Sequence, residues 1–362
     1  MSSGASSAPA QIYAIATAYP SHIMSQSDVE AQAAKVFGHK PDYFRRMAAA
    51  YGNAGVETRH SCVPLDWYLE PHGWPERMRL YERNALALLT GAAQRCFAQA
   101  DIAASDIAAT VTVSSTGVVT PSLDSLIQAP LGLAPTVQRL PVFGLGCAGG
   151  VIGLSRAAAL ARALPGQWVL FMCVELCGLT FRPGDDSKAN LIGTAIFGDG
   201  AAAMLVRVPD NPGEGACRPL AAVSAWGEHT WPDTRDIMGW RVEDDGLGVV
   251  FSRDIPHLVQ TQLRDVIDVF LEENSLILNQ LDGVMCHPGG EKVLAALEHA
   301  LELDADALRH ARDVLRTKGN MSAVTVLAVL ERAVAGRDSG RHLMTALGPG
   351  FTSAMALIDL CS

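Results

Sequence analysis

Residues 136–150, TVQRLPVFGLGCAGG, join a predicted strand to a predicted helix through a glycine-rich turn that holds Cys147. The strand covers residues 136–145, and the alanine-rich run Arg156–Leu164 continues the helix until a Pro-Gly pair stops it. Glycines around the cysteine permit a tight turn and a close approach of a ligand. The turn therefore presents a thiol at the start of a helix.

Cys147 in this position has two interpretations. The N-terminus of a helix favours a thiolate over a thiol, which predicts a lowered pKa and a reactive nucleophile. The backbone N–H groups of the same turn can also bind an oxyanion. The alternative is a buried structural cysteine, and the turn alone does not decide between the two.

Short apolar runs alternate with helical patterns along the rest of the chain. This alternation is typical of an α/β protein whose sheets are covered by helices. The predicted strands are 108–114, 167–174, 200–208, 221–225, 283–286 and 354–360, and further helices are predicted at 258–274, 291–303 and 322–335.

The densest cluster of turn-forming residues, Pro209–Gly215, predicts a boundary between two halves of the chain. We expect a loose N-terminal tail at residues 1–10, an N-terminal half at 11–210 and a C-terminal half at 216–362. The two halves look alike in kind, although the sequence has no visible repeat.

Composition excludes several classes of protein. Of the 362 residues, 49% are hydrophobic and 18% are charged, which suits a large buried core and not a disordered chain. The net charge of −10, without a run of like charges, disfavours nucleic acid and anionic membranes as partners. No secretory signal or membrane-spanning run is evident. The eight cysteines form no CxxC pair, so we expect no metal site and a reduced, cytoplasmic protein.

Two further turns carry polar residues suited to catalysis. An apolar strand ends on His287, and Pro-Gly-Gly then leads into a helix. Asn320 stands just before another apolar helix. Each has an ordinary alternative, a surface histidine in the first case and an N-cap in the second.

Cysteine, histidine and asparagine on three such turns form a recognised chemical set. A histidine can activate or pair with the thiolate, and histidine with asparagine can donate to a developing oxyanion. A Cys–His pair alone would also suit a cysteine hydrolase.

At this point the chain resembles the type III polyketide synthases, the chalcone-synthase-like branch of the thiolase superfamily. The resemblance runs from Ile12 to Leu360 and rests on motifs in a consistent order. These are Thr120-Pro121-Ser122, Gly146-Cys147-Ala148-Gly149-Gly150, Phe197-Gly198-Asp199-Gly200, His287-Pro288-Gly289-Gly290, Gly319-Asn320-Met321-Ser322 and Gly348-Pro349-Gly350.

The resemblance implies a thiolase-like, five-layered αβαβα fold of two similar halves, and a homodimer. It implies free acyl-CoA and malonyl-CoA as substrates, and no cofactor. Cys147 would hold the starter acyl group, with His287 stabilising the thiolate as an ion pair. His287 and Asn320 would hold the thioester oxygen of malonyl-CoA while it loses CO₂. The resulting carbanion would attack the acyl-Cys147 thioester, and cyclisation would follow.

Matching to the family also assigns the cavity. Phe197 corresponds to a gatekeeping phenylalanine, and the second gatekeeper falls on Val249, with Phe251 on the same strand face. The other cavity positions are Ser115, Thr116, Thr120, Cys177, Thr180, Trp240, Ser322, Gly348, Pro349 and Gly350. For the phosphates of CoA the first candidate is Arg59, followed by Arg45 and Arg46.

The stretches Val174–Phe181 and Met238–Trp240 look like those of bacterial members that use fatty acyl starters. We therefore expect a medium- or long-chain acyl-CoA primer and an alkylpyrone or alkylresorcinol product. The alternatives are a malonyl-primed synthase of a phloroglucinol or tetrahydroxynaphthalene, and a ketoacyl-ACP synthase of the initiating type. From a different class, the chain could be a catalytically silent acyl-binding partner or scaffold.

Overall fold

The computed structural model describes residues 8–210, 218–304 and 306–361. Its centre is a nine-stranded sheet that contains strands from both halves of the chain. In spatial order the strands are β11 (Gly283–Cys286), β12 (Gly340–Gly348), β13 (Thr352–Leu360), β8 (Ala221–Thr230), β1 (Ala10–Ala18), β7 (Asp199–Arg207), β6 (Trp168–Leu176), β4 (Ile107–Ser114) and β5 (Gln138–Phe143).

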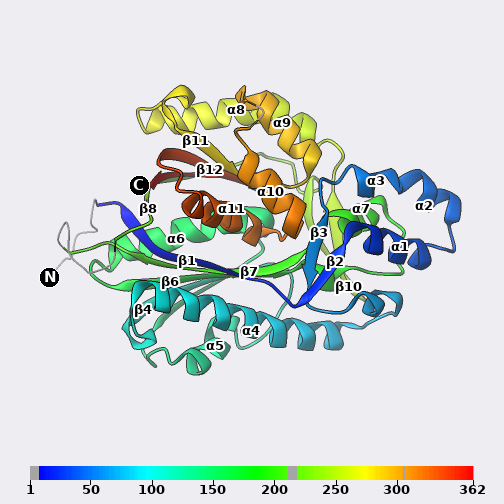
Figure 1. Cartoon of the computed structure of the whole chain (residues 1–362), viewed down its shortest axis with the longest axis horizontal. Coiled ribbons are helices and arrows are strands. Elements are labelled where there is room, and N and C mark those ends of the chain that lie inside the picture. Colours follow the sequence, from blue (N-terminus) through cyan, green and yellow to red (C-terminus); the bar gives the residue numbers. More distant parts are fainter. Residues whose placement is uncertain (1–7, 211–217, 305, 362) are drawn as a thin grey trace.

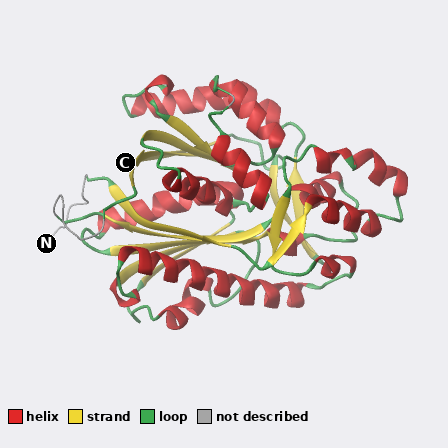
Figure 2. Cartoon of the chain, in the orientation of Figure 1, coloured by secondary structure: helices red, strands yellow, loops and turns green. Residues whose placement is uncertain are grey.

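Figure 1 and Figure 2 show that the two ends of this sheet form separate layers with helices between and outside them. Helices α6 (Gly149–Ala163) and α11 (Ala323–Ala335) lie in the middle. Below the first half of the sheet lie α4 (Trp74–Ala100) and α5 (Leu123–Leu131), and above the second lie α8 (Ile255–Glu273) and α9 (Glu291–Leu301). The expected five-layered αβαβα architecture is confirmed.

The two halves repeat one pattern of strand pairing. In the first half, β1 and β6 both pair antiparallel with β7, and β4 pairs parallel with β6. In the second half, β8 and β12 both pair antiparallel with β13, and β11 pairs parallel with β12. The central helices α6 and α11 directly precede the equivalent strands β6 and β12. The halves are therefore similar in topology, as the sequence pattern predicted.

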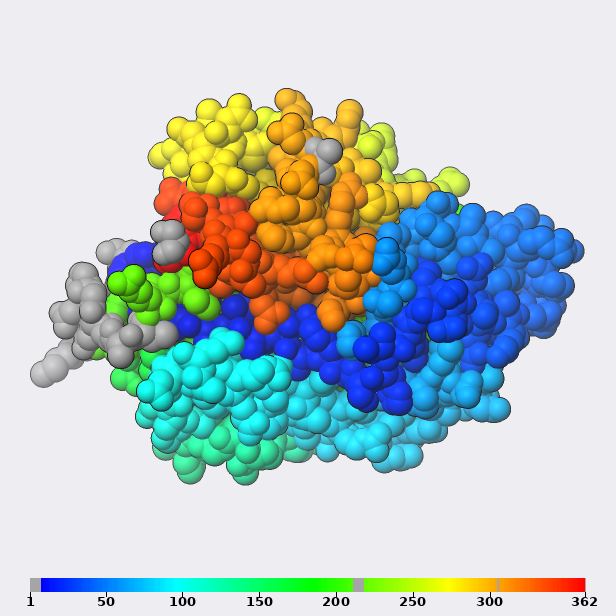
Figure 3. Space-filling model, in the orientation of Figure 1, coloured from blue at the N-terminus to red at the C-terminus, as the bar shows by residue number. Residues whose placement is uncertain are grey.

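A group of smaller elements closes one end of the layered body, at the right of Figure 1. Its members are β2 (His22–Ser25), α1 (Gln26–Val36), α2 (Pro41–Met47), α3 (Ala49–Gly52), β3 (Thr58–Ser61), the 3₁₀ turn η1 (Leu65–Leu69), α7 (Lys188–Ile196), and the hairpin of β9 (Met238–Glu243) and β10 (Gly246–Phe251). Figure 3 shows this blue N-terminal region packed against the orange C-terminal half, where α10 (Arg309–Lys318) lies. The backbone N–H of Glu57 donates to the carbonyl of Arg316 at 2.8 Å.

The predicted elements occur with small shifts of their ends, and three features differ. Ala10 is already a buried residue of β1, so the expected tail at residues 1–10 is too long. The predicted boundary at Pro209–Gly215 lies largely outside the described residues. The sequence pattern also did not predict β1, α4, α5, α10 or β12, nor the group of smaller elements that includes α1, α7 and the β9–β10 hairpin. Among the helices that the structure describes, none is long and apolar enough to span a membrane.

Candidate active site

Cys147 lies in a short 3₁₀ turn, Gly146–Ala148, that leads directly into α6. Gly146 has a φ of +47°, and a Cβ at this position would lie 2.6 Å from the Cδ of Pro349. Only glycine satisfies both conditions without displacing its neighbours. The N–H of Gly146 donates to the Oγ of Ser115 at 3.0 Å, which fixes the turn to the end of β4. The sequence of the turn thus holds the thiol in one place.

Asn320 occupies the equivalent position in the second half, just before α11. The first turns of helices α6 and α11 are in contact. They lie so close that a Cβ on Gly150 would clash with the carbonyl oxygen of Ala323. Both N-terminal ends therefore meet at one site. The backbone of Asn320 is held there by hydrogen bonds with Ile196 at 2.7 Å and Gly198 at 2.9 Å.

His287 follows the last residue of β11. Its backbone N–H donates to the carbonyl of Thr345 at 2.9 Å, which continues the pairing of β11 with β12. Cys147, His287 and Asn320 all line one cavity of about 250 Å³, which we call the catalytic cavity. Three turns far apart in sequence thus bring the predicted residues together.

The polar groups of this cavity are free to meet a ligand. Neither ring nitrogen of His287 has a hydrogen-bond partner among the described residues, although the side chain is buried. The amide of Asn320 accepts from the N–H of Ser322 at 2.8 Å and donates to the carbonyl of Gly289 at 3.2 Å. One of its two amide hydrogens remains available. Unpaired buried polar groups are costly in a fold, so they point to a function.

The pKa values differ from the sequence prediction. Burial raises the pKa of the Cys147 thiol to about 12, and the opposing effect of a hydrogen bond with Ser322 is smaller. Burial also lowers the pKa of His287 to about 3. The expected lowering of the cysteine pKa by the helix N-terminus is therefore wrong, because desolvation outweighs it. Both shifts favour a neutral thiol and a neutral imidazole over the expected ion pair.

Glu175 is a buried residue near this site that the sequence analysis missed. It lies in β6, where its Oε2 accepts from the N–H of Ser115 at 3.0 Å and its Oε1 has no partner among the described residues. Burial raises its pKa to about 8, and its charge contributes to the raised pKa of Cys147. A single carboxylate inside an otherwise apolar strand was the available signal.

Three aromatic rings close the passage beside Cys147. The ring centroid of Phe197 lies 5.7 Å from that of Phe251 and 6.0 Å from that of Trp240. These rings line, together with Cys147 and Val249, a narrow pocket of about 20 Å³, which we call the gate pocket. Val249 and Phe251 are two residues apart on β10, and both face it. The ring that meets Phe197 thus comes from Phe251, while Val249 forms the neighbouring wall.

The remaining cavity predictions have mixed outcomes. Ser322 and Pro349 line the gate pocket, whereas Cys177 and Thr180 line a separate cavity beyond Phe197. Gly348 is buried at the end of β12, and Gly350 has a φ of +75° in the following turn.

Three predicted cavity positions have other surroundings. Ser115 and Thr116 are buried, and their hydroxyls accept from backbone N–H groups of Gly146 and Leu176. They fix neighbouring segments and do not line any of the three cavities near Cys147. Thr120 is exposed, because the chain has left the sheet at Ser114 and crosses the surface toward α5. Within the single chain it lines none of the three cavities near Cys147.

Arg59 is not available to CoA, which corrects the first candidate for a phosphate contact. Its side chain is 3% exposed and donates to the carbonyls of Thr194 at 2.6 Å and Ala195 at 2.9 Å, and to Gln26. It also donates to the carbonyl of Phe197 at 3.2 Å. Arg59 therefore fixes the segment that carries the gatekeeping ring.

Other basic residues surround the catalytic cavity. Lys188, Arg253 and Lys292 line it, and all three are exposed. The other two predicted candidates, Arg45 and Arg46, lie on α2 and do not line this cavity. Sequence reasoning missed the basic set because its members come from three separate segments.

Comparison with known proteins identifies the family. Residues 70–209 match the family model "Chalcone and stilbene synthases, N-terminal domain", and residues 223–359 match the corresponding C-terminal domain. The chain belongs to the chalcone and stilbene synthase family. It is a type III polyketide synthase, an acyltransferase with a thiolase-like fold.

Individual relatives cover nearly the whole synthase. It is 35% identical to a putative chalcone synthase of Bacillus subtilis, over 96% of this chain and 98% of the relative. It is 38% identical to a 1,3,6,8-tetrahydroxynaphthalene synthase of Streptomyces peucetius, over 96% and 92%. The crystal structure of the 1,3,6,8-tetrahydroxynaphthalene synthase of Streptomyces coelicolor superposes with a TM-score of 0.90 at 28% identity, covering 97% of this chain and 99% of that one.

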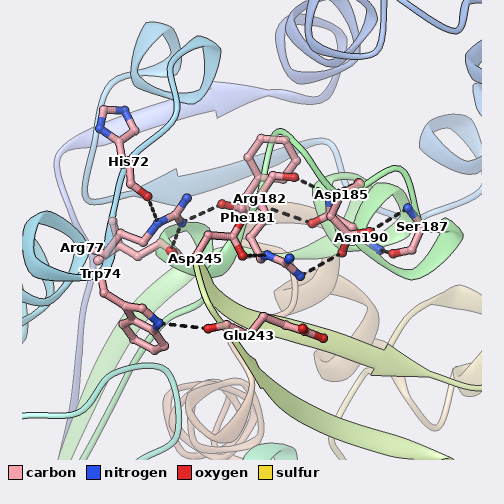
Figure 4. Close-up of polar contacts among 11 residues, drawn as sticks. His72, Trp74, Arg77, Phe181, Arg182, Asp185, Ser187, Asn190, Glu243 and Asp245 are labelled. Carbon is pink, nitrogen blue, oxygen red and sulfur yellow. Dashed lines mark hydrogen bonds and ion pairs between the residues drawn. The ribbon is translucent and has the colours of Figure 1, made fainter.

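The synthase holds its β9–β10 hairpin over the gate pocket by a set of polar contacts drawn in Figure 4. The Nε of Arg182 donates to Asp245 at 2.6 Å, and the indole N–H of Trp74 donates to the carbonyl of Glu243 at 3.2 Å. Arg77 donates to the carbonyl of Phe181 at 2.6 Å and so fixes the segment that carries Arg182. Because the hairpin belongs to a separate two-stranded sheet, these contacts keep Trp240 and Phe251 in position.

Removing the contact between Arg182 and Asp245 should make the β9–β10 hairpin more mobile. In Arg182→Ala we expect amide hydrogens of residues 238–251 to exchange about tenfold faster, the equivalent of one partly buried ion pair. Arg264→Ala is the matched control, since Arg264 pairs with Asp268 on α8 at 2.8 Å. Equal exchange in the two variants would contradict the anchoring role.

His287 should make the stability of the synthase sensitive to acid. Its folded-state pKa of about 3 lies below the unfolded value of 6.5, so stability is full above pH 6.5 and declines as pH falls toward 3. At pH 5 the loss is about 2 kcal/mol relative to pH 8. His287→Gln should lack this component. Denaturant titrations of both proteins at the two pH values measure it, and an identical pH dependence would refute the assignment.

Proposed function

We propose that the synthase primes on a medium- or long-chain acyl-CoA, extends the acyl chain with malonyl-CoA, and cyclises it to an alkylpyrone or alkylresorcinol. The observation that carries the proposal is the single cavity in which a buried thiol, a neutral imidazole and a free amide donor meet below a basic rim. CoA thioesters are substrates in this scheme, and no cofactor is needed.

Loading of the starter acyl group uses the neutral thiol of Cys147 and the neutral imidazole of His287. The Sγ of Cys147 attacks the carbonyl carbon of the starter thioester while a ring nitrogen of His287 takes the thiol proton. The bond from that carbon to the CoA sulfur then breaks, and the proton passes to the departing CoA. A pKa of about 12 for Cys147 makes this proton transfer essential near neutral pH.

Decarboxylation of malonyl-CoA uses the two hydrogen-bond donors of the cavity, Asn320 and His287. The bond between the methylene carbon and the carboxylate carbon of malonyl-CoA breaks, CO₂ leaves, and the electron pair of that bond forms an enolate. The thioester oxygen of this enolate accepts from the amide of Asn320 and from the N–H of His287. The enolate carbon then attacks the acyl group on Cys147 and releases the cysteine, so each round adds two carbons.

The basic rim is suited to the phosphates of CoA. Lys188, Arg253 and Lys292 are the exposed cations of the catalytic cavity, and a chain of net charge −10 requires such a local set to attract an anion. Neither Lys188 nor Lys292 forms an ion pair with another described residue. Their ammonium groups are therefore free for a ligand.

Reversing one of these charges should weaken CoA binding. For Arg253→Glu we expect the KM for malonyl-CoA to rise about tenfold, which corresponds to one charge-assisted phosphate contact. Arg45→Glu is the control, because Arg45 is exposed but does not line the catalytic cavity. Steady-state kinetics at low and high salt measure both, and an equal rise in Arg45→Glu would contradict the rim assignment.

We also propose a homodimer in a reduced, cytoplasmic setting. Strand β5 is the edge of the nine-stranded sheet, and Phe143, Leu140 and the nearby Val118 are exposed apolar residues. An unpaired apolar edge favours pairing with a second copy. The seven described cysteines are all free.

A second candidate is a malonyl-primed synthase of a tetrahydroxynaphthalene, favoured by the names of two relatives. Mass spectrometry of the products from acyl-CoA starters of increasing length, each supplied with malonyl-CoA, distinguishes the two. We expect alkylpyrones or alkylresorcinols whose mass follows the starter. Naphthalene polyols that form from malonyl-CoA alone, regardless of the starter present, would refute the fatty primer.

A further inference from the structure

An open groove of about 560 Å³ lies between α4 and α11, and we call it the β1 groove. Strand β1 pairs with β8 only over Ala10–Ile12, whereas its pairing with β7 continues to Ala18, so one edge of β1 is open. Ile15, Thr17 and Tyr19 form the floor of the groove along this edge. In Figure 3 the dark-blue β1 lies between the cyan α4 and the orange C-terminal helices. None of the described residues that line the β1 groove lines the catalytic cavity or the gate pocket.

The backbone groups on the open edge of β1 are already hydrogen-bonded to side chains. The N–H of Ile15 donates to Gln99 of α4 at 3.2 Å, and the N–H of Thr17 donates to Glu331 of α11 at 2.9 Å. The carbonyl of Thr17 accepts from Arg95. A peptide added as a further strand would have to displace these side chains. The groove therefore favours a small ligand over a peptide.

Lys318 supplies a half-buried cation at one end of the groove. Its Nζ donates to the Nε2 of His60 at 3.2 Å and lies 4.3 Å from the ring centroid of Tyr19. The Nδ1 of His60 donates to the carbonyl of Pro20 at 2.7 Å, so His60 accepts as a neutral ring. Among the described residues Lys318 forms no ion pair. Burial and the charge of Arg332 lower the pKa of Lys318, as expected for an ammonium without a counter-charge.

The other charges of the groove are compensated. Arg332 forms an ion pair with Asp313. The two carboxylate oxygens of Glu331 accept from the N–H of Thr17 at 2.9 Å and from its hydroxyl at 2.5 Å. Lys318 is thus the lining charge that a ligand can neutralise, and the ligand group that does so is an anion.

The opposite end of the groove is apolar. Leu220 and Val334 line it beside Ile15, and the N–H of Leu220 donates to the carbonyl of Ile12 at 2.7 Å. This bond places Leu220 at the start of β1, whereas Tyr19 and Lys318 lie past its end. The four residues from Ile15 to Tyr19 span roughly 13 Å, which suits an alkyl chain of medium length.

The cationic end adjoins the backbone of the catalytic site. Lys318 precedes Asn320 by two residues, and a Cβ on Gly198 would clash with the carbonyl oxygen of Lys318. Gly198 follows the gatekeeping Phe197, and its N–H donates to the carbonyl of Asn320 at 2.9 Å. A ligand held by Lys318 therefore stabilises the segment that carries both Asn320 and Phe197.

We propose that the β1 groove binds a medium-chain fatty carboxylate, with the carboxylate on Lys318 and the alkyl chain along β1 toward Leu220. The bound ligand stabilises the backbone bridge between Asn320 and Gly198 from the side opposite the catalytic cavity. This site goes beyond the proposed function and does not depend on which starter the synthase loads.

Octanoate binding to the wild-type synthase, measured by calorimetry, tests the proposal. We expect octanoate to bind about tenfold more tightly than 1-octanol, which lacks the charge, and Lys318→Met to remove this difference. Methionine retains an unbranched chain that packs on Tyr19. Lys35→Met is the matched control, because Lys35 also lies in the last turn of a helix and donates to a neutral side chain, Gln32, at 3.1 Å.

Val334→Glu provides a second variant if Lys318→Met does not fold, and it should weaken octanoate binding about tenfold by placing a charge beside the alkyl chain. Unchanged octanoate affinity in either folded variant would overturn the proposal. An equal loss in Lys35→Met, or equal affinity of the wild-type synthase for octanoate and 1-octanol, would do the same.

Hydrogen exchange locates the bound octanoate. At ten times its Kd, octanoate should slow amide exchange about tenfold in residues 13–19, 318–322 and 328–335, where exchange requires release of the ligand. Protection confined to residues 251–256 and 287–297 would mean that octanoate occupies the catalytic cavity alone, and the β1 groove would then be refuted as its site.

Discussion

Cys147→Ala is expected to abolish product formation, with a loss on the order of 10⁴-fold or more in condensation rate. Among the described residues that line the catalytic cavity, Cys147 supplies the only thiol, at the start of α6, and the same cavity holds the unpartnered imidazole of His287. Without it the starter has no covalent attachment, so the enolate has no acyl group to attack. Product formation and the mass of the acylated protein are the two measurements.

The matched control is Cys173→Ala, which removes another buried thiol from the centre of β6. Cys173 does not line the catalytic cavity, so loading and condensation should persist. Slow CO₂ release should also persist in Cys147→Ala, because His287 and Asn320 remain in place. Product formation by Cys147→Ala at the wild-type rate would refute covalent catalysis.

Asn320→Ala is expected to slow decarboxylation by about 10² to 10³-fold, the usual cost of one donor to a developing oxyanion. Loading of the starter should change much less, because that step depends on Cys147 and His287. Single-turnover measurements of CO₂ release and of acyl-protein formation separate the two steps. A comparable loss in both would mean that the substitution disturbs the site as a whole.

Asn320→Asp provides a sharper control. The aspartate retains an oxygen to accept from the N–H of Ser322, which Asn320 now does at 2.8 Å, so the local backbone is preserved. It replaces the free amide donor with a carboxylate that repels the enolate. Decarboxylation should therefore be lost in Asn320→Asp as well, and recovery of the rate would contradict the donor role.

Ordered motifs were enough to predict much of the fold. The Gly-Cys-Ala-Gly-Gly turn, the strand ending on His287 and the Gly-Asn turn each lie at the start or end of a regular element, and periodicity indicates such ends. The sequence pattern indicated that the two halves are alike in kind, but the layered arrangement of the halves could be expected only from the family resemblance. The equivalent strand pairing around α6 and α11 becomes visible in the strand order of the structure.

Properties that depend on burial could not be predicted. Arg59 looked suited to a phosphate, but the fold directs its guanidinium onto the carbonyls of Thr194 and Ala195. The helix N-terminus suggested a lowered pKa for Cys147, and desolvation in three dimensions reverses that direction. The basic rim likewise depends on where three distant segments meet. Sequence identifies chemical groups, whereas their surroundings decide what they do.

The most direct test of the account follows labelled carbon. Wild-type enzyme is supplied with decanoyl-CoA and malonyl-CoA labelled in its free carboxylate, without any carrier protein, and released CO₂ is counted against new carbon–carbon bonds. We predict one labelled CO₂ for each two-carbon extension and a decanoyl adduct on the peptide that contains Cys147. The absence of both CO₂ and adduct would contradict the central claim that Cys147, His287 and Asn320 form a decarboxylative condensing site.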